Sequence, residues 1–326
     1  MKPGRYFYAA FGLSICSDIP VMEFVSLQPL ENYEIRIRAE RARPDFPLYQ
    51  GANHSFRIDK EDAILYFSGV GEYRICAGRQ VTIIPAEQAT SRTIELYLSG
   101  VVFAVLLYLR GLLVYHGSCV AHRTHGAVAL VGDSGAGKST LAAVLQQRGY
   151  GFLSDDVVAL DIQAPTRSIS VYPGFPLLKI SPELAARLQL DSCELLAVQE
   201  GESKAYLPVC GECGQGDRGR QSGECGQGDR ERGVAPAFPL GAICFLEVGE
   251  ERALERLSAR ETMIQSIRYT MPTRLLQQSG EQAHFQQCAL VARSVPAYRF
   301  ARRLSFQELE GDADLLEQYM SLKGDM

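Results

Sequence analysis

Short β-prone runs separated by turn-forming residues make up the first third of the chain. Segments rich in β-branched and aromatic residues, lying between glycine-containing turns such as residues 68–71 and 78–80, are typical of strands. Residues 34–38 alternate charged side chains with isoleucine, as expected of a strand with one solvated face. We therefore predict a small β-rich N-terminal domain over residues 1–95. Its predicted strands are residues 7–15, 33–38, 64–67, 73–76 and 81–84.

The longest uncharged apolar stretch covers residues 96–109 and ends at Arg110. It is shorter than the ~20 residues that span a bilayer, so we predict a buried helix and no membrane segment. A second apolar run, residues 6–16, follows Lys2 and Arg5 as in a signal peptide. Because no small-residue cleavage motif follows it and it is rich in aromatic residues, we interpret it as a folded strand.

From residue 112 onward the order of elements changes to strand, glycine-rich loop, helix and strand. This alternation is the sequence signature of an α/β domain. We predict that the domain covers residues 96–326. Its predicted strands are residues 112–116, 118–121, 126–131, 242–246 and 297–301, and its predicted helices are residues 261–269 and a last helix from about residue 312.

A duplicated octamer interrupts this domain, because residues 211–218 recur almost unchanged as residues 223–230. The segment is rich in glycine and charge and nearly free of apolar residues, so it cannot offset its own ordering entropy. We predict a flexible glycine-rich insertion at residues 210–236. A zinc site is the alternative interpretation, but no fourth ligand lies at a usual spacing. The cysteines concerned are Cys210, Cys213 and Cys225.

Composition narrows the class of protein. Hydrophobic residues are 46% of the 326 residues, enough for a substantial core, and the 22% of charged residues argues against disorder. With 33 Lys+Arg against 38 Asp+Glu, the net charge of -5 argues against broad binding of nucleic acid or anionic membranes. The nine scattered cysteines are expected to be reduced thiols, and we predict a cytoplasmic location.

The strongest motif in the chain is a complete G-x-x-x-x-G-K-S sequence between an apolar strand and a helix. Its residues are Gly132, Asp133, Ser134, Gly135, Ala136, Gly137, Lys138 and Ser139. Glycines let consecutive backbone N–H groups converge on phosphate oxygens, and the helix N-terminus adds partial positive charge. In such a loop Lys138 reaches the β- and γ-phosphates, Ser139 ligates Mg²⁺, and Thr140 is placed for the α-phosphate. The motif therefore predicts binding of ATP with Mg²⁺.

Two adjacent carboxylates, Asp155 and Asp156, follow the predicted helix at the end of an apolar strand. A P-loop enzyme needs one carboxylate near the metal, and a hydroxyl kinase gains from a second that accepts the proton of a weak nucleophile. We therefore predict that the pair belongs to an active site rather than to a solvent-exposed turn. His116 is a further candidate, for holding a carboxylate or contacting the γ-phosphate, with a structural role as the alternative.

The order and spacing of these motifs resemble the catalytic core of the HPr kinase/phosphorylase family. The resemblance covers residues 112–160 and rests on His116-Gly117, the glycine-rich loop, Arg148-Gly149-Tyr150 and the acidic pair. It implies an α/β fold with a central mixed sheet and a nucleotide-dependent serine kinase activity. It also implies Asp155 as the base toward the hydroxyl and Asp156 as a support for the metal. His116 would then assist at the phosphate.

A finer resemblance covers most of the chain and points to the stand-alone HPr-kinase-related proteins of lasso-peptide biosynthesis. It rests on residues 11–15, 171–179, 204–208 and 242–247. Members of that group phosphorylate the C-terminal serine of a precursor peptide, so the resemblance implies such a peptide as the acceptor. The glycine-rich segment that follows the acidic pair in HPr kinases has no counterpart here. This departure argues against HPr as the acceptor and against the reverse phosphorylase activity.

Three alternative functions stay open at this point: an HPr-type protein serine kinase, a small-molecule kinase and a nucleotide-binding regulator without phosphotransfer. The chain lacks the N/T-K-x-D motif of GTPases. It also lacks the Leu-Ser-Gly-Gly signature that transporter ATPases carry after the P-loop. Both observations favour a kinase. As partner we predict a peptide or small protein that presents a serine, and neither nucleic acid nor a membrane. The sequence leaves the oligomeric state open.

Four basic residues are weaker candidates for binding. Lys179 and Lys204 are placed to contact a phosphate or a peptide carboxylate, with a solvated side chain as the alternative. Arg36 and Arg38, on the alternating strand, form either a solvated face or a docking edge for an acidic peptide.

Overall fold

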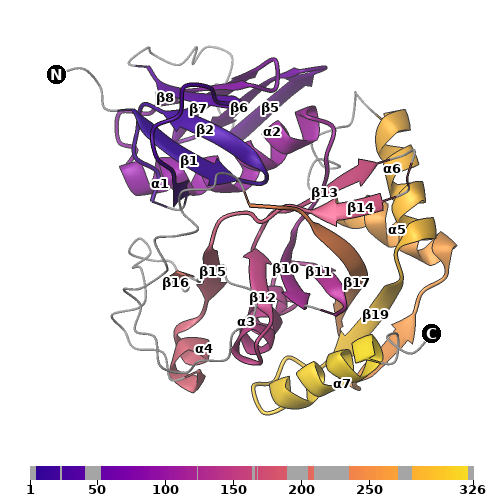
Figure 1. Ribbon diagram of the computed structural model, residues 1–326. Helices are drawn as coiled ribbons and strands as arrows, with labels where there is room; N and C mark the ends of the chain where they lie inside the picture. The colour runs from indigo at the N-terminus through magenta and orange to yellow at the C-terminus, as the bar shows by residue number, and fades with distance from the viewer. Residues whose placement is uncertain are drawn as a thin grey trace.

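Two mixed β-sheets organise the molecule, one in the N-terminal third and one in the rest of the chain (Figure 1). The computed structural model describes residues 5–22, 24–40, 53–122, 124–163, 166, 168–188, 205–208, 235–270 and 281–321. Residues 210–234 of the predicted insertion at residues 210–236 lie outside the described residues. The same is true of its three cysteines and of Lys204.

The N-terminal sheet has eight strands in the order β3-β1-β2-β4-β8-β7-β6-β5. The strands are β1 (Tyr6–Ala10), β2 (Leu13–Ser17), β3 (Val25–Ser26), β4 (Ile35–Ala39), β5 (His54–Asp59), β6 (Asp62–Phe67), β7 (Gly71–Cys76) and β8 (Gln80–Pro85). Strand β4 runs parallel to both β2 and β8, and the other pairs are antiparallel. The predicted β-rich region is therefore a mixed sheet.

The prediction of one strand over residues 7–15 is wrong, because the segment folds into the β1–β2 hairpin. Its turn is made by Phe11 and Gly12, whose φ angles are 51° and 75°. Backbone at positive φ cannot continue a strand, and glycine is the residue that adopts it at least cost. The apolar run hides this turn, because Phe11 is fully buried and reads as one more strand residue.

The predicted buried helix is confirmed, but it is kinked at Gly100, whose φ and ψ angles of -87° and -105° are not helical. It consists of α1 (Ser91–Tyr97), a π-helical turn η2 (Leu98–Val102) and α2 (Phe103–Leu109). By length and composition alone this helix is apolar enough to cross a membrane. In the molecule the helix lies against the N-terminal sheet (Figure 1). Its apolar side chains pack in a core that also includes Val114, Val157 and Phe175. The domain boundary at residue 95 stays a prediction.

The second sheet has nine strands, with β11, β17 and β19 parallel at its centre. The strands are β9 (Leu113–Tyr115), β10 (Gly117–His122), β11 (Gly126–Gly132), β12 (Gly151–Ser154), β13 (Val158–Gln163), β14 (Ser168–Val171), β17 (Phe238–Val248), β18 (Ala253–Arg256) and β19 (Ala297–Arg302). A separate two-stranded ribbon joins β15 (Leu177–Ile180) to β16 (Ala205–Pro208).

Helices cover both faces of this sheet. One face packs against α3 (Lys138–Gln147), α4 (Pro182–Arg187) and α7 (Leu309–Ser321), and the other against α5 (Ala259–Tyr269) and α6 (Glu281–Ser294) (Figure 1). The predicted α/β fold with a mixed central sheet is confirmed at this level of description. In this three-layer arrangement the helices cover the faces of the sheet, so functional residues can lie at the strand ends and in the loops between them.

The two halves meet at an aromatic cluster of Phe11, Phe24, Phe103 and Phe175. Beside it the Phe11 N–H donates to the Pro173 carbonyl at 2.7 Å, and the Gly174 N–H donates to the Leu153 carbonyl at 2.8 Å. These contacts fix the segment that enters β15 against the end of β12. They therefore hold Lys179, on β15, next to the acidic pair that follows β12.

Candidate active site

The glycine-rich loop joins the central strand β11 to helix α3. Gly135 and Gly137 have φ angles of 84° and 81°, which permit the tight reversal into the helix. The Lys138 ammonium curls back over the loop and donates to the carbonyls of Gly132 and Asp133 at 3.0 and 2.9 Å. The strand, the glycine turn and the helix N-terminus follow one another in the order that the motif predicts, and phosphate binding there stays a prediction.

A buried arginine supports the loop from behind. Arg302, at the end of β19, donates to the carbonyls of Ala136 and Gly137 at 3.0 and 3.1 Å. It also pairs with the buried Asp312 at 3.0 Å. A Cβ on Gly137 would collide with this guanidinium, so glycine is required there for space as well as for its φ angle.

Asp155 lies directly against the loop, in the turn between β12 and β13. Its Oδ1 accepts hydrogen bonds from the hydroxyls of Ser139 at 2.9 Å and Ser118 at 2.5 Å. Its Oδ2 accepts from the Lys179 backbone N–H at 3.0 Å. Burial raises the pKa of Asp155, and the neighbouring charge of Asp156 raises it further. Such a carboxylate is stabilised in its charged form when a cation arrives beside it.

Asp156 faces outward from the same turn, and its side chain is 30% exposed. Its φ angle is 66°, the left-handed region that asparagine and aspartate adopt more readily than most residues. Its carboxylate forms an ion pair with the Lys179 ammonium. The two carboxylates therefore point to different surroundings, one into the protein and one toward the solvent.

His116, in the turn between β9 and β10, contacts the backbone of Asp156. Its Nδ1 is 3.1 Å from the Asp156 carbonyl oxygen, which only accepts, so Nδ1 carries the proton. Burial lowers the pKa of His116, and the Lys138 charge lowers it further. The ring is therefore neutral near pH 7, and its Nε2 is a hydrogen-bond acceptor. His116 holds the acidic turn in place rather than adding charge to the site.

Comparison with known proteins gives likenesses among solved structures only. No family model matches the chain, and no curated protein matches it. Among solved structures, the HPr(Ser) kinase/phosphatase from Coxiella burnetii is similar at a TM-score of 0.32 and 10% sequence identity, over 64% of this chain and 98% of that chain. A TM-score this low assigns neither the fold nor an activity, so function is inferred from the geometry of the site.

The donor set suits a magnesium ion shared with a nucleotide. Ser139 and Asp155 offer a hydroxyl and a carboxylate oxygen 2.9 Å apart, both hard ligands of the kind Mg²⁺ takes. Among the residues the structure describes, no cluster of three or more histidine, cysteine, aspartate or glutamate side chains could hold a metal alone. Mg²⁺ needs no such cluster, because phosphate oxygens and waters complete its octahedron.

Two residues at the end of α5 also contact the site, and no pattern in the sequence predicts them. The Arg268 guanidinium donates to the Asp133 carboxylate at 2.9 Å, and the Tyr269 hydroxyl donates to the same oxygen at 3.4 Å. The Tyr269 carbonyl also accepts from the His116 backbone N–H at 3.3 Å. Asp133, at the exposed start of the glycine-rich loop, and the turn that carries His116 are thus both hydrogen-bonded to the end of α5.

The structure brings most of the predicted site residues together. The P-loop, the acidic pair and His116 converge, and Lys179 joins them from β15. Arg148, part of the family-like motif, lies instead at the far end of α3. It pairs there with Glu310, Asp314 and Glu317 of α7 at 2.5–2.8 Å, so its contacts are structural.

Proposed function

We propose that the protein is an ATP-dependent kinase that transfers a phosphoryl group to a serine hydroxyl of a peptide or small protein in the cytoplasm. One observation carries the proposal: Ser139 of the glycine-rich loop is hydrogen-bonded to Asp155, and Asp156 follows at once with its side chain toward solvent. P-loop kinases need a carboxylate at the metal and benefit from a base at the acceptor.

The contacts favour a division of roles opposite to the one that the family resemblance implies. Asp155 accepts three hydrogen bonds, one of them from Ser139 of the loop, so we assign it to the metal side of the site. Asp156 is reachable by an acceptor, and we assign it as the base. When bound, Mg²⁺ would be held by Ser139 and Asp155 and would neutralise charge that develops on the β- and γ-phosphate oxygens.

The transfer balances with these residues. The acceptor Oγ forms a bond to the γ-phosphorus while the bond from that phosphorus to the β,γ-bridging oxygen breaks and ADP leaves. The hydroxyl proton passes to the Asp156 carboxylate and then to solvent. Lys138 releases the carbonyls of Gly132 and Asp133 and donates to the β- and γ-phosphates in their place.

The acceptor proposed is the C-terminal serine of a lasso-peptide precursor, on the strength of the motif resemblance. Incubation with γ-labelled ATP and a panel of acceptors tests this: a peptide ending in serine, the same peptide ending in alanine, HPr, and small alcohols. Label on the terminal serine supports the proposal. ATP hydrolysis without label on any acceptor would show a nucleotide-binding regulator, and label on small alcohols would show a small-molecule kinase.

Lys138→Ala is expected to weaken both ATP binding and transfer. The ammonium is the charged group of the loop, and charge-assisted hydrogen bonds contribute about 1.5–3 kcal/mol each. Losing one or two of them corresponds to a roughly 10- to 25,000-fold loss in affinity. Isothermal titration with ATP and Mg²⁺ measures it. Arg293→Ala, an exposed residue on α6, is the control and should leave affinity unchanged.

We expect Leu304 and Phe306 to contact the nucleobase. They follow β19 and are 52% and 38% exposed, and a Leu304 methyl lies 3.5 Å from the place a Cβ would take on Gly137. Apolar side chains beside the phosphate loop are suited to pack against a base. The double change Leu304→Ala and Phe306→Ala should lower ATP affinity about tenfold, the effect of roughly 1.4 kcal/mol of lost contact.

Tripolyphosphate separates a base contact from damage to the loop. Because it has no base, its affinity should be the same for the double variant and the unmodified protein. Val248→Ala is the matched control, since Val248 is 63% exposed at the end of β17. Equal losses for ATP and tripolyphosphate would contradict the assignment of the two residues to the base.

A further inference from the structure

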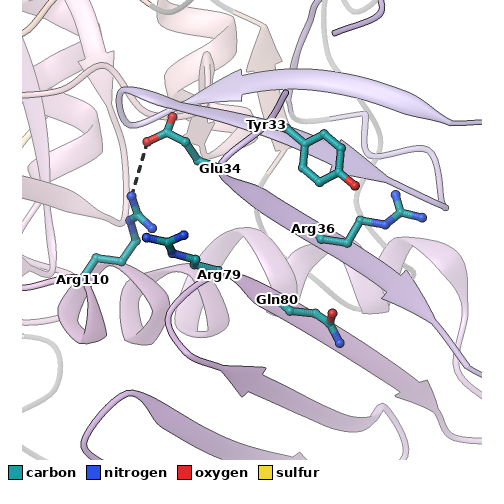
Figure 2. A pocket seen from close by; sticks show the side chains of 6 residues that line it. All are labelled: Tyr33, Glu34, Arg36, Arg79, Gln80 and Arg110. Atoms are coloured by element: carbon teal, nitrogen blue, oxygen red, sulfur yellow. Dashed lines mark hydrogen bonds and ion pairs between the residues drawn. The ribbon is translucent and has the colours of Figure 1, made fainter. Parts of the chain in front are cut away.

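A pocket of 380 Å³ opens at one end of the N-terminal sheet, and none of the residues assigned to phosphotransfer lines it (Figure 2). Its lining carries three positive charges and one negative charge. The lining residues are Tyr33, Glu34, Arg36, Arg79, Gln80 and Arg110.

Three separate elements build this pocket. Arg36 and Gln80 are register partners on the parallel strands β4 and β8, so their side chains leave the sheet on the same face. Their chain neighbours Ile35, Ile37 and Val81 are buried in the core, which directs Arg36 and Gln80 away from it. Arg110 reaches the pocket from the end of α2, as Figure 2 shows.

Two of the three guanidinium groups are held in place by neighbouring residues. Arg36 forms an ion pair with Asp18. Arg110 donates to the Gly78 carbonyl at 3.1 Å and more loosely to Glu34 at 3.4 Å. A fixed guanidinium fork presents its remaining N–H groups in a set geometry, which suits a carboxylate.

The third guanidinium, that of Arg79, carries the uncompensated charge of the pocket. It forms no ion pair with any residue that the structure describes. Figure 2 shows it turned toward Arg110, which is the residue that pairs with Glu34. Like charges side by side on a chain of net charge -5 form a local anion site against an acidic background.

We propose that this pocket docks an acidic segment of the phosphate acceptor, with one of its carboxylates between Arg79 and Arg110. The inference rests on the proposed function, because it names how that acceptor is held. At 380 Å³ the pocket is at the small end of the range for ligand pockets, with room for one or two side chains of a bound segment. Tyr33, 36% exposed at its rim, adds the aromatic surface that peptide interfaces favour.

The pocket is joined to the catalytic centre by a short piece of backbone. Arg110 ends the helix, and β9 then leads to His116. Six Cα–Cα steps of 3.8 Å separate these two residues, so their Cα atoms lie at most about 23 Å apart. Roughly seven extended acceptor residues cover that distance at 3.3 Å each. The acidic residue should therefore lie within about seven positions of the phosphorylated serine.

A fluorescent probe peptide tests the docking. It carries Asp-Glu-Glu, a five-residue Gly-Ser-free spacer of alanines and asparagines, and a single serine; its matched partner carries Asn-Gln-Gln instead. Fluorescence anisotropy should show binding of the acidic peptide at least tenfold tighter than the neutral one. Arg79→Ala should remove most of that difference. Arg57→Ala, an exposed arginine on β5 of the same sheet, should leave it unchanged.

Several results would overturn the docking site. The first is an equal loss of acidic-peptide binding for Arg79→Ala and Arg57→Ala. The second is displacement of the peptide by ATP. The third is displacement by inorganic phosphate at the same concentration as the peptide, because that would show a site for small anions. Titration of the unmodified protein with ATP is run in parallel. Intact ATP binding without acidic-peptide binding refutes the docking site alone. Absent ATP binding refutes the proposed kinase, whatever the peptide does.

Discussion

Asp156→Asn is expected to lower the rate of phosphotransfer by roughly 100- to 10,000-fold, the range that a positioned general base contributes. The amide keeps the size of the side chain, and asparagine adopts the positive φ of this position as readily as aspartate. It loses the ability to take the acceptor proton and also the charge that pairs with Lys179. ATP affinity, measured by titration calorimetry with Mg²⁺, should stay within about threefold, because the γ-phosphate contacts are unchanged.

Asp155→Asn distinguishes the two carboxylates. Because Asp155 accepts from Ser139, its removal should raise the Mg²⁺ concentration needed for half-maximal ATP binding, an effect that Asp156→Asn should not have. Asp161→Asn is the control, since Asp161 lies on β13 and accepts from the Gln163 amide at 2.8 Å and the Tyr172 hydroxyl at 3.2 Å, not from any residue of the site. If instead Asp155→Asn abolishes transfer with Mg²⁺ dependence intact, the roles are those that the family resemblance implies.

The parts of the site that sequence alone predicts are those fixed by local spacing. Gly135 and Gly137 occupy the positive-φ positions that the motif requires, and Lys138 starts the helix. The position of the acidic pair beside the loop can also be predicted, because a short helix and one strand bring the chain back to the loop. In each case the neighbours along the chain also determine the neighbours in space.

Contacts made by distant segments could not be predicted in this way. Ser118 meets Asp155 only because β10 pairs with both β11 and β12, and a serine among apolar residues gives no sign of its partner. Arg268 and Arg302 reach the loop from the ends of α5 and β19. Arginines in helices and strands are common on surfaces, so only the packing of the sheet shows that these two serve the loop.

Helix α6 was missed for a different reason. Its described buried positions include His284, Cys288 and Val291, which follow the i, i+4, i+7 spacing of a helix face. Two of the three are not strongly hydrophobic residues, so the periodic signal is faint. His284 is buried because its Nε2 contacts the Thr270 hydroxyl at 2.9 Å, a contact that the pattern of hydrophobic residues does not contain.

The second large effect is expected beneath the P-loop, for Arg302→Met. Arg302 and Asp312 are 1% and 0% exposed, so the change leaves a buried carboxylate without one of its two arginine partners. Breaking a buried pair in this way costs about 3–5 kcal/mol. Urea denaturation should show this loss in the free energy of unfolding. ATP affinity should fall as well, because the carbonyls of Ala136 and Gly137 lose their donor.

Arg299→Met on the same strand is the matched control. Arg299 is 34% exposed, and its three carboxylate partners lie 3.6–3.8 Å away, so its removal should cost no more than about 1 kcal/mol. Adding Asp312→Leu to Arg302→Met removes the buried charge that is left with Arg252 alone and should restore part of the stability without restoring ATP affinity. That separation would identify Arg302 as a positioning residue. Equal losses for Arg302→Met and Arg299→Met would mean that the buried pair neither stabilises the fold nor supports the loop.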